Sequence, residues 1–208
     1  KAVIFVACGG SQAAIYPGKY LLEREANEIA VSIYNSNEFN YVTPKSLDER
    51  CIVICCSLKA TAETVHAVER ARQFGAVTIA MTGSPETGMA KAGEYVVVYS
   101  NGDEQIYSQS NQSMALRLGF EILHQFEGYP LYHEAMAAFD QIDTIVAESK
   151  QSMLPAAQSF AVEYQNDPLF QVLGAGPLYG TAYSMANCNS MEMHRRNAIM
   201  THSGEYLH

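Results

Sequence analysis

A glutamate and a histidine in the last stretch of the sequence are the residues best suited to move a proton. Glu192 stands at the predicted end of a helix, and His208 follows a short predicted strand and a Ser-Gly-Glu turn. A carboxylate and an imidazole brought together can shift a proton between adjacent carbons of an open-chain sugar. The neighbours Met191 and Met193 predict partial burial of Glu192, which raises the pKa of a carboxyl group. Glu205 is a candidate to orient His208 or to contact the sugar. For Glu192, the alternative is an ordinary helix-end glutamate that is solvated or caps the helix.

The first candidate anion site is a glycine-containing loop near the start of the sequence. Gly9, Gly10 and Ser11 follow the apolar run 2–8, which predicts a buried strand, and precede a helix that extends to about residue 25. Glycines at a strand end allow the backbone to approach an anion, and a helix start offers free N–H groups. Ser11 is expected to cap this helix and to add a hydroxyl donor. The loop lacks the G-x-G-x-x-G and Gly-Lys-Ser/Thr patterns of nucleotide sites, and a plain capped turn is an open alternative.

The second candidate anion site is the loop between the predicted strand 51–56 and the predicted helix 61–74. Ser57 and Thr61 supply hydroxyl groups, Lys59 supplies a positive charge, and the helix start supplies amides. Both loops follow strands of one predicted parallel sheet, so they lie at its carboxyl edge, where ligands of such sheets gather. Together they predict binding of a phosphate monoester. Helix capping, with Lys59 as a solvated surface charge, is the alternative.

Two further polar segments adjoin the same edge. The segment 36–39 follows the second predicted strand, and its Glu38 is placed to receive a sugar hydroxyl unless the segment is a surface loop with Phe39 in the core. The segment 107–113 is dense in serine, glutamine and asparagine before a predicted helix. It either lines the same pocket or forms an ordinary polar helix cap.

Strands and helices alternate through the first part of the sequence. This spacing predicts right-handed crossovers and a sheet covered on both faces. The expected fold class is therefore α/β, with a flavodoxin-like, doubly wound, five-stranded parallel sheet. The predicted strands are 2–8, 28–33, 51–56, 77–81 and 95–99.

The rest of the sequence repeats the opening theme after a helical stretch. Apolar residues at helical spacing predict helices at 114–126 and 132–146, with Pro130 and Pro155 as interruptions. A strand at 169–173 then meets a Gly-Ala-Gly-Pro turn and a helix that runs to about residue 192. We therefore expect a first domain at 1–128, connecting helices at 129–166, and the truncated start of a second similar domain at 167–208.

Composition narrows the class of protein. The net charge of −9 argues against a general nucleic-acid partner, which requires clustered lysine and arginine. The longest apolar runs are strand-sized and too short to cross a membrane, and the sequence opens on an apolar strand without a signal peptide. Five cysteines, an odd number without a C-x-x-C pair, predict a reduced cytoplasmic protein with buried thiols. No spacing of metal ligands is found, and no cofactor is expected.

Several of these segments resemble the tandem sugar isomerase (SIS) domain proteins. The closest resemblance is to the fructosamine 6-phosphate deglycases, and a more distant one is to the isomerase half of glucosamine-6-phosphate synthase. The final segment is the most specific of those that carry the resemblance. The segments are Val6-Ala7-Cys8-Gly9-Gly10-Ser11, Tyr34-Asn35-Ser36-Asn37-Glu38-Phe39, 57–64, Met191-Glu192-Met193 and His202-Ser203-Gly204-Glu205-Tyr206-Leu207-His208.

The resemblance implies roles for the candidate residues. It implies that Glu192 is the base on the sugar carbon, that His208 assists ring opening and proton delivery, and that Ser11, Ser57 and Thr61 lie where the family binds phosphate and sugar. It also implies a homodimer with the active site between subunits. The second loop departs from the family pattern Ser-x-x-Gly-x-Thr, because its glycine is missing and it is one residue shorter.

The expected reaction is cleavage of a fructosamine 6-phosphate to glucose 6-phosphate and an amine or amino acid through an enaminol. Two alternatives stay open: aldose–ketose or amino-sugar phosphate isomerisation by the same residues, and a non-catalytic sugar-phosphate regulator. The expected partners are a sugar phosphate and a second copy of the chain, with no nucleic acid and no membrane.

Overall fold

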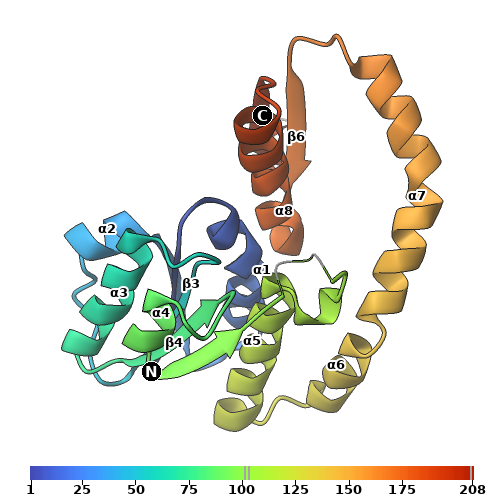
Figure 1. The fold of residues 1–208 in the computed structure, drawn as a ribbon. Coiled ribbons are helices and arrows are strands. Elements are labelled where there is room, and N and C mark those ends of the chain that lie inside the picture. Colours follow the sequence, from blue (N-terminus) through green and yellow to red (C-terminus); the bar gives the residue numbers. More distant parts are fainter. Residues whose placement is uncertain (101, 103, 207) are drawn as a thin grey trace.

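The structure is a computed structural model that describes residues 1–100, 102, 104–206 and 208. Its main feature is a five-stranded, all-parallel sheet with the strand order β2-β1-β3-β4-β5 (Figure 1). This is the flavodoxin-like order, so the predicted α/β fold is confirmed. The strands are β1 (Ala2–Ala7), β2 (Ala30–Asn35), β3 (Cys51–Cys56), β4 (Val77–Thr82) and β5 (Tyr95–Val98).

Helices cover both faces of the sheet because its strands are apolar on both sides. One face packs against α1 (Gly9–Glu25) and α5 (Asn111–Glu127), and the other against α2 (Ser36–Tyr41), α3 (Ala62–Gln73) and α4 (Gly88–Ala92). The adjacent Cys55 and Cys56 show the alternation of a strand, since Cys56 belongs to the first core and Cys55 to the second. All five cysteines are free thiols.

The start of α1 differs from the sequence-based expectation. The helix begins at Gly9, its N-cap is Cys8, and no side chain caps it, so the prediction that Ser11 caps this helix is wrong. The reason is the φ of +55° at Gly9, a left-handed conformation that lets the chain leave β1 and enter the helix at once. Ser11 lies inside the first helical turn.

The connecting helices also differ in extent. The predicted helix 132–146 is broken between α6 (Tyr132–Phe139) and α7 (Ile142–Tyr164), and Pro155 lies within α7 and does not interrupt it. A proline inside a helix removes one backbone hydrogen bond and can bend the helix without ending it. No residue of α7 is buried, and Figure 1 shows this helix as an arc along one side of the molecule. Its first turn is held to the rest of the chain by Asp143, which accepts the backbone N–H of Ser108 at 2.8 Å. No helix among the described residues is both long enough and apolar enough to cross a bilayer.

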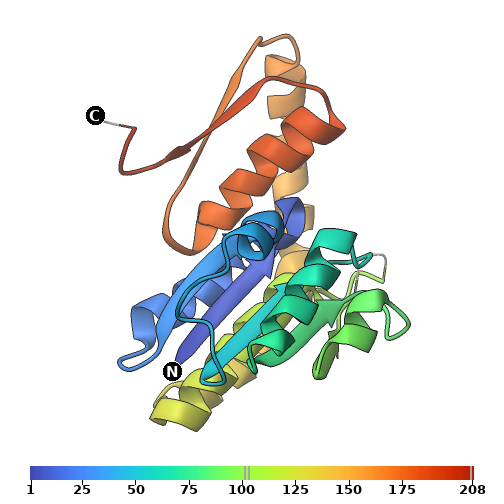
Figure 2. The ribbon, with the colours of Figure 1, turned by 90° about the vertical axis from the view of Figure 1, so that its left-hand side faces the viewer.

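A second, smaller unit follows α7. Strands β6 (Phe170–Gly174) and β7 (Ala198–His202) pair in parallel, and between them lie the short η2 (Gly176–Leu178), α8 (Tyr179–Tyr183) and a ten-residue π-helix, η3 (Ser184–Met193). This unit rests on α1, as Figure 2 shows. The division into 1–128, 129–166 and 167–208, and the identity of the last part as the start of a second domain, stay predictions.

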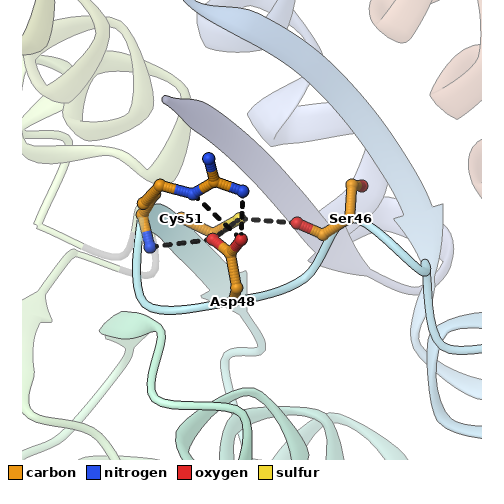
Figure 3. A network of polar contacts seen from close by, with 4 residues as sticks. Ser46, Asp48 and Cys51 are labelled. Atoms are coloured by element: carbon orange, nitrogen blue, oxygen red, sulfur yellow. Dashed lines mark hydrogen bonds and ion pairs between the residues drawn. The ribbon is translucent and has the colours of Figure 1, made fainter.

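The turn that enters β3 is held by its own polar groups (Figure 3). Asp48 accepts hydrogen bonds from the backbone N–H and the guanidinium group of Arg50, at 2.9 Å for the backbone contact and 3.0 Å from Nε. These bonds hold the pKa of Asp48 below its ordinary value. The thiol of Cys51 donates to the carbonyl oxygen of Ser46 at 3.3 Å. This turn lies at the amino edge of the sheet, opposite to the candidate site, and fixes where β3 begins.

Candidate active site

Both predicted anion loops lie at the carboxyl edge of the sheet. In the parallel pair of β1 and β3, Ala7 is level with Cys56, so the loops that follow these strands begin side by side. The end of β2 is level with them, because Asn35 is paired with Ala7. The two loops therefore lie together at the carboxyl edge, as predicted from the sequence.

In the first loop, Gly9 and Ser11 are half-buried and Gly10 is exposed. A Cβ atom built on Gly10 would meet only Cys188 Sγ, at 3.8 Å, so this loop faces η3 of the second unit. Gly9 has open space around it, and its positive φ is therefore the reason for glycine there. The loop exposes the amino end of α1 toward the second unit.

In the second loop, Ser57 is buried and its Oγ accepts a hydrogen bond from the backbone N–H of Thr61 at 3.1 Å. Thr61 is the N-cap of α3 and is exposed. Ala60 has a φ of +52°, so the chain keeps a left-handed turn although the glycine typical of related loops is missing. A left-handed alanine costs about 1–2 kcal/mol, which the loop tolerates to close on Ser57.

Two residues that sequence reasoning did not assign to the site stand directly behind Thr61. Thr64 Oγ1 lies 3.2 Å from Thr61 Oγ1 and 2.9 Å from Ser36 Oγ, so three hydroxyl groups form a chain. Ser36 and Thr64 are fully buried. The spacing of Thr61 and Thr64 was a usable signal, because residues three apart on a helix are neighbours. Nothing in the sequence places Ser36 against them.

Lys59 points to a different place. It is exposed and lines a cleft of about 680 Å³ at the carboxyl ends of β3, β4 and β5, together with Ser84, Tyr99 and Glu104. Gly9, Ser11, Ser57 and Thr61 do not line this cleft. The structure therefore brings Ser57 and Thr61 together at one loop and directs Lys59 to the neighbouring cleft.

The remaining polar segments resolve into structural roles. The segment 36–39 is the start of α2, in which Phe39 is fully buried and Glu38 is exposed. In the segment 107–113, Ser110 caps α5 by accepting the N–H of Ser113 at 3.3 Å. The capping alternative is thus confirmed for Ser110, although Gln109 lines the cleft next to Lys59.

A buried thiol and a buried phenol lie beneath the first loop. Cys56 donates from Sγ to Tyr99 Oη over 3.8 Å, and both residues are buried. Desolvation raises the pKa of Cys56 to about 12 and raises the pKa of Tyr99 above its ordinary value. Hydrogen bonding to Ser11 opposes both shifts. Cys56 is therefore a neutral thiol near pH 7 and is unsuited to act as a nucleophile.

Glu192 lies near the end of η3, where the sequence placed it at a helix end. The expected partial burial is wrong: Glu192 is exposed, and Met191 and Met193 are 41% and 70% exposed. Cys188, which faces Gly10, precedes Glu192 by four residues, or about one helical turn. The carboxylate therefore lies one turn beyond the contact between η3 and the first loop.

The structure does not join Glu192 to His208 within one chain. His208 is exposed, and its backbone N–H donates to the carbonyl oxygen of Glu205 at 3.2 Å. No hydrogen bond or ion pair links the two candidate catalytic side chains in the described part of the chain. In Figure 2 the end of η3 and the chain end lie on opposite sides of the second unit. Glu205 is exposed as well, and Leu207 of the same segment lies outside the described residues.

Over 1–100, 102, 104–206 and 208, no group of three or more metal-ligating side chains is found. A smaller cavity of about 340 Å³ lies between α1 and α8, lined by residues that include Gln12, Tyr16, Tyr179 and Tyr183. It adjoins the first loop and carries mainly phenol groups. The chemistry available at this edge is thus hydroxyl and amide donors from the first unit and a carboxylate from the second.

Comparison with known proteins agrees with this architecture. The model of the SIS domain family matches residues 1–121. Fructosamine deglycase FrlB from Bacillus subtilis (strain 168) is 36% identical over 207 residues, which cover 99% of this chain and 63% of that protein. Fructoselysine 6-phosphate deglycase from Escherichia coli O157:H7 is 26% identical over 219 residues, covering 99% of this chain and 60% of that protein.

A crystal structure from Salmonella typhimurium LT2, assigned to the phosphosugar isomerases, superposes with a TM-score of 0.96 at 37% identity and covers 100% of this chain and 63% of that one. The chain thus spans less than two thirds of the length of these relatives. The family model covers more than half of the chain, and the flavodoxin-like sheet and the paired strand-end loops agree with it. The chain therefore belongs to the SIS domain family.

Proposed function

We propose that this chain forms the sugar-phosphate site and part of the proton-transfer machinery of an enzyme that cleaves fructosamine 6-phosphates. The products are glucose 6-phosphate and an amine or amino acid. The observation that carries the proposal is the close approach of Gly10 and Cys188, which sets the helix bearing Glu192 against the first loop. The names of the two deglycases that match 99% of the chain support the same substrate class.

The phosphate group is proposed to bind where hydroxyl and amide donors gather at the carboxyl edge. Ser57 and Thr61 supply hydroxyls, and the amino end of α3 supplies a partial positive charge. Gly9, Gly10 and Ser11 supply the facing loop. Several donors on one phosphate give charge-assisted hydrogen bonds, which are stronger than neutral ones. Lys59 and Glu205 are proposed to contact the substrate from the adjoining cleft and from the second unit.

The proposed chemistry is a proton shift followed by hydrolysis. After ring opening, Glu192 removes a proton from the carbon that bears the amine, which gives an enaminol. Protonation of the neighbouring carbon then gives the imine of glucose 6-phosphate, and water adds to this imine and releases the amine. His208 assists ring opening and delivers a proton. Each step moves a proton or water only, so these side chains suffice for it.

The working site is proposed to form between two copies of the chain. In support of this, Glu192 and His208 are both exposed, and the segments that carry them lie on opposite sides of the second unit (Figure 2). A homodimer in which Glu192 of one copy faces His208 of another restores the pair. Such a site is incomplete in a single chain.

One product measurement tests the proposal. The purified protein is incubated with fructosamine 6-phosphates that carry different amino acids, and glucose 6-phosphate and free amino acid are quantified in the same sample. We expect the two products to appear in equal amounts. Release of neither product from any conjugate would contradict a deglycase.

Isomerisation is the second candidate, favoured by the 37% identity to a chain assigned to the phosphosugar isomerases. It predicts interconversion of a ketose phosphate and an aldose phosphate without any free amine. The same assay, run with fructose 6-phosphate and amino-sugar phosphates, separates the two reactions. An isomerase converts these sugars and leaves the fructosamine conjugates intact.

A further inference from the structure

The buried hydroxyl chain behind the second loop has no role in the chemistry described so far. It runs from Ser36 at the start of α2, through Thr64 in the first turn of α3, to Thr61 at the surface, over 2.9 Å and 3.2 Å. Ser36 and Thr64 have no exposed surface, whereas Thr61 is exposed. A fully buried polar pair of this kind calls for a reason, because buried hydroxyl groups are costly unless they are paired.

The direction of the hydrogen bonds follows from counting protons. Each hydroxyl has one proton to donate and can accept others. In the described part of the chain, Ser36 Oγ has no hydrogen-bond partner except Thr64 Oγ1. If Thr61 donates to Thr64 and Thr64 donates to Ser36, the proton of Ser36 is left buried without an acceptor, which carries a free-energy cost. In the opposite direction every buried proton is used.

The favoured direction has a consequence at the surface. Ser36 donates to Thr64, Thr64 donates to Thr61, and the proton of Thr61 is left to point outward. The backbone N–H of Thr61 donates to Ser57 Oγ, so the main chain of Thr61 is held in place as well. A phosphate accepts hydrogen bonds and donates few, which makes an outward-pointing proton a suitable ligand and an outward lone pair an unsuitable one.

We propose that Ser36 and Thr64 are positioning residues for the phosphate site: they form a one-way hydrogen-bond chain that presents the hydroxyl proton of Thr61 to an anion. This inference rests on the proposed function, because that function places the phosphate at Thr61. It adds two buried residues that touch no substrate. Hydrogen bonds in a chain also polarise one another, which strengthens the last donor.

The test compares variants by calorimetric titration with two probes, glucose 6-phosphate and inorganic phosphate. Thr64→Val keeps the shape of the side chain and removes the hydroxyl. We expect it to lower the affinity for both probes about threefold to tenfold. Thr61→Val removes the hydroxyl that is proposed to contact the phosphate, and we expect it to lower both affinities about tenfold or more. Ser36→Ala leaves Thr64 with Thr61 as its acceptor, so the direction survives and the expected loss is only about twofold.

Two controls separate hydrogen bonding from packing. Thr64→Ser deletes a buried methyl group and lowers stability in urea, yet it keeps the hydroxyl and should keep most of the affinity. Thr78 is a fully buried threonine on β4 whose Oγ1 accepts the N–H of Glu94 at 3.0 Å. Thr78→Val should therefore lower stability without changing the affinity for either probe.

The outcomes distinguish this inference from the proposed function. The one-way chain is wrong if Thr61→Val lowers the affinity for the probes and Thr64→Val does not. It is also wrong if Thr64→Ser lowers the affinity as much as Thr64→Val. In both cases the enzyme proposal stands. If the graded losses appear but no fructosamine 6-phosphate is cleaved, the chain is supported and the proposed function fails. If the unchanged protein binds neither probe, no anion meets Thr61 and the inference is overturned as well.

Discussion

At the scale of residues, the proposed chemistry depends on two exposed side chains that a single chain keeps apart. Glu192 and His208 are both exposed, and neither is bonded to the other in the described residues. Solvent exposure is an unfavourable environment for proton transfer to carbon, because catalytic electrostatics are strongest where water is excluded. In the proposed homodimer, a second copy of the chain would supply the missing partner and exclude water from the pair.

This arrangement predicts complementation between two inactive variants. We expect Glu192→Gln and His208→Ala each to lower kcat by about 10²- to 10⁴-fold, since each removes one proton-transfer group. When the two variants are unfolded and refolded together, one of the two sites in each mixed dimer regains both residues. The measured activity should then recover to about a quarter of that of the unchanged protein.

Glu148→Gln, on the exposed face of α7, serves as the control and should keep full activity. A mixture that stays as inactive as its components would place both residues of each site in the same chain. Each variant is assayed alone first. If either variant alone keeps full activity, the residue that it replaces is not needed for proton transfer.

At the scale of elements, the end of α5 is tied to the connection between α1 and β2 by one carboxylate. Glu127 accepts the backbone N–H groups of Asn27 at 2.7 Å and of Glu28 at 3.0 Å. These bonds hold the pKa of Glu127 below its ordinary value. A carboxyl group with a lowered pKa stabilises the fold at a pH above the unfolded pKa and loses this effect as the pH falls through the folded pKa.

Glu127→Gln should therefore destabilise the protein in a pH-dependent way. At pH 7 we expect a loss of about 1 kcal/mol in the free energy of unfolding, reduced by the partial exposure of the group. The gap from the unchanged protein should begin to narrow below about pH 4.5, where the carboxyl group of the unfolded chain takes up a proton. It should close as the pH falls through the lower pKa of the folded protein. Urea unfolding at a series of pH values measures the difference in unfolding free energy between the two proteins. A difference that does not vary with pH would show that the charge of Glu127 does not contribute to stability.

The elements also show which features the sequence encodes locally. All five strands were predictable because each is a short apolar run, and β3 begins and ends at the predicted residues. The strand β2 begins two residues late, at Ala30, because the backbone of Glu28 is held by Glu127 from a helix 99 residues away. The ten-residue π-helix and the continuation of α7 through Pro155 likewise have no local signal.

The candidate site was predictable to a similar degree. The parallel strands ensured that Gly9, Ser11, Ser57 and Thr61 would meet at one edge. The exposure of Glu192 was not predictable, because it depends on how the π-helix turns its methionines. The contact of Ser36 with Thr64 was not predictable either, since it joins two helices that follow non-adjacent strands.

At the scale of the whole molecule, α1 connects the two units that form the proposed site. It packs against α5 within the first unit and against α8 in the second. A Cβ atom on Gly180 would overlap the carbonyl oxygen of Ala13, so the two helices approach as closely as their backbones allow. This contact sets the distance between the anion loops at the sheet edge and the end of η3.

The central claim is that a sugar phosphate lies between those loops and η3, and a crystal structure with glucose 6-phosphate tests it most directly. We predict the phosphate group on the hydroxyls of Ser57 and Thr61 at the amino end of α3, with the first two sugar carbons toward Glu192. Glucose 6-phosphate bound instead at the opposite edge of the sheet, in the cavity of about 670 Å³ lined by Val3 and Ile122, would contradict the account.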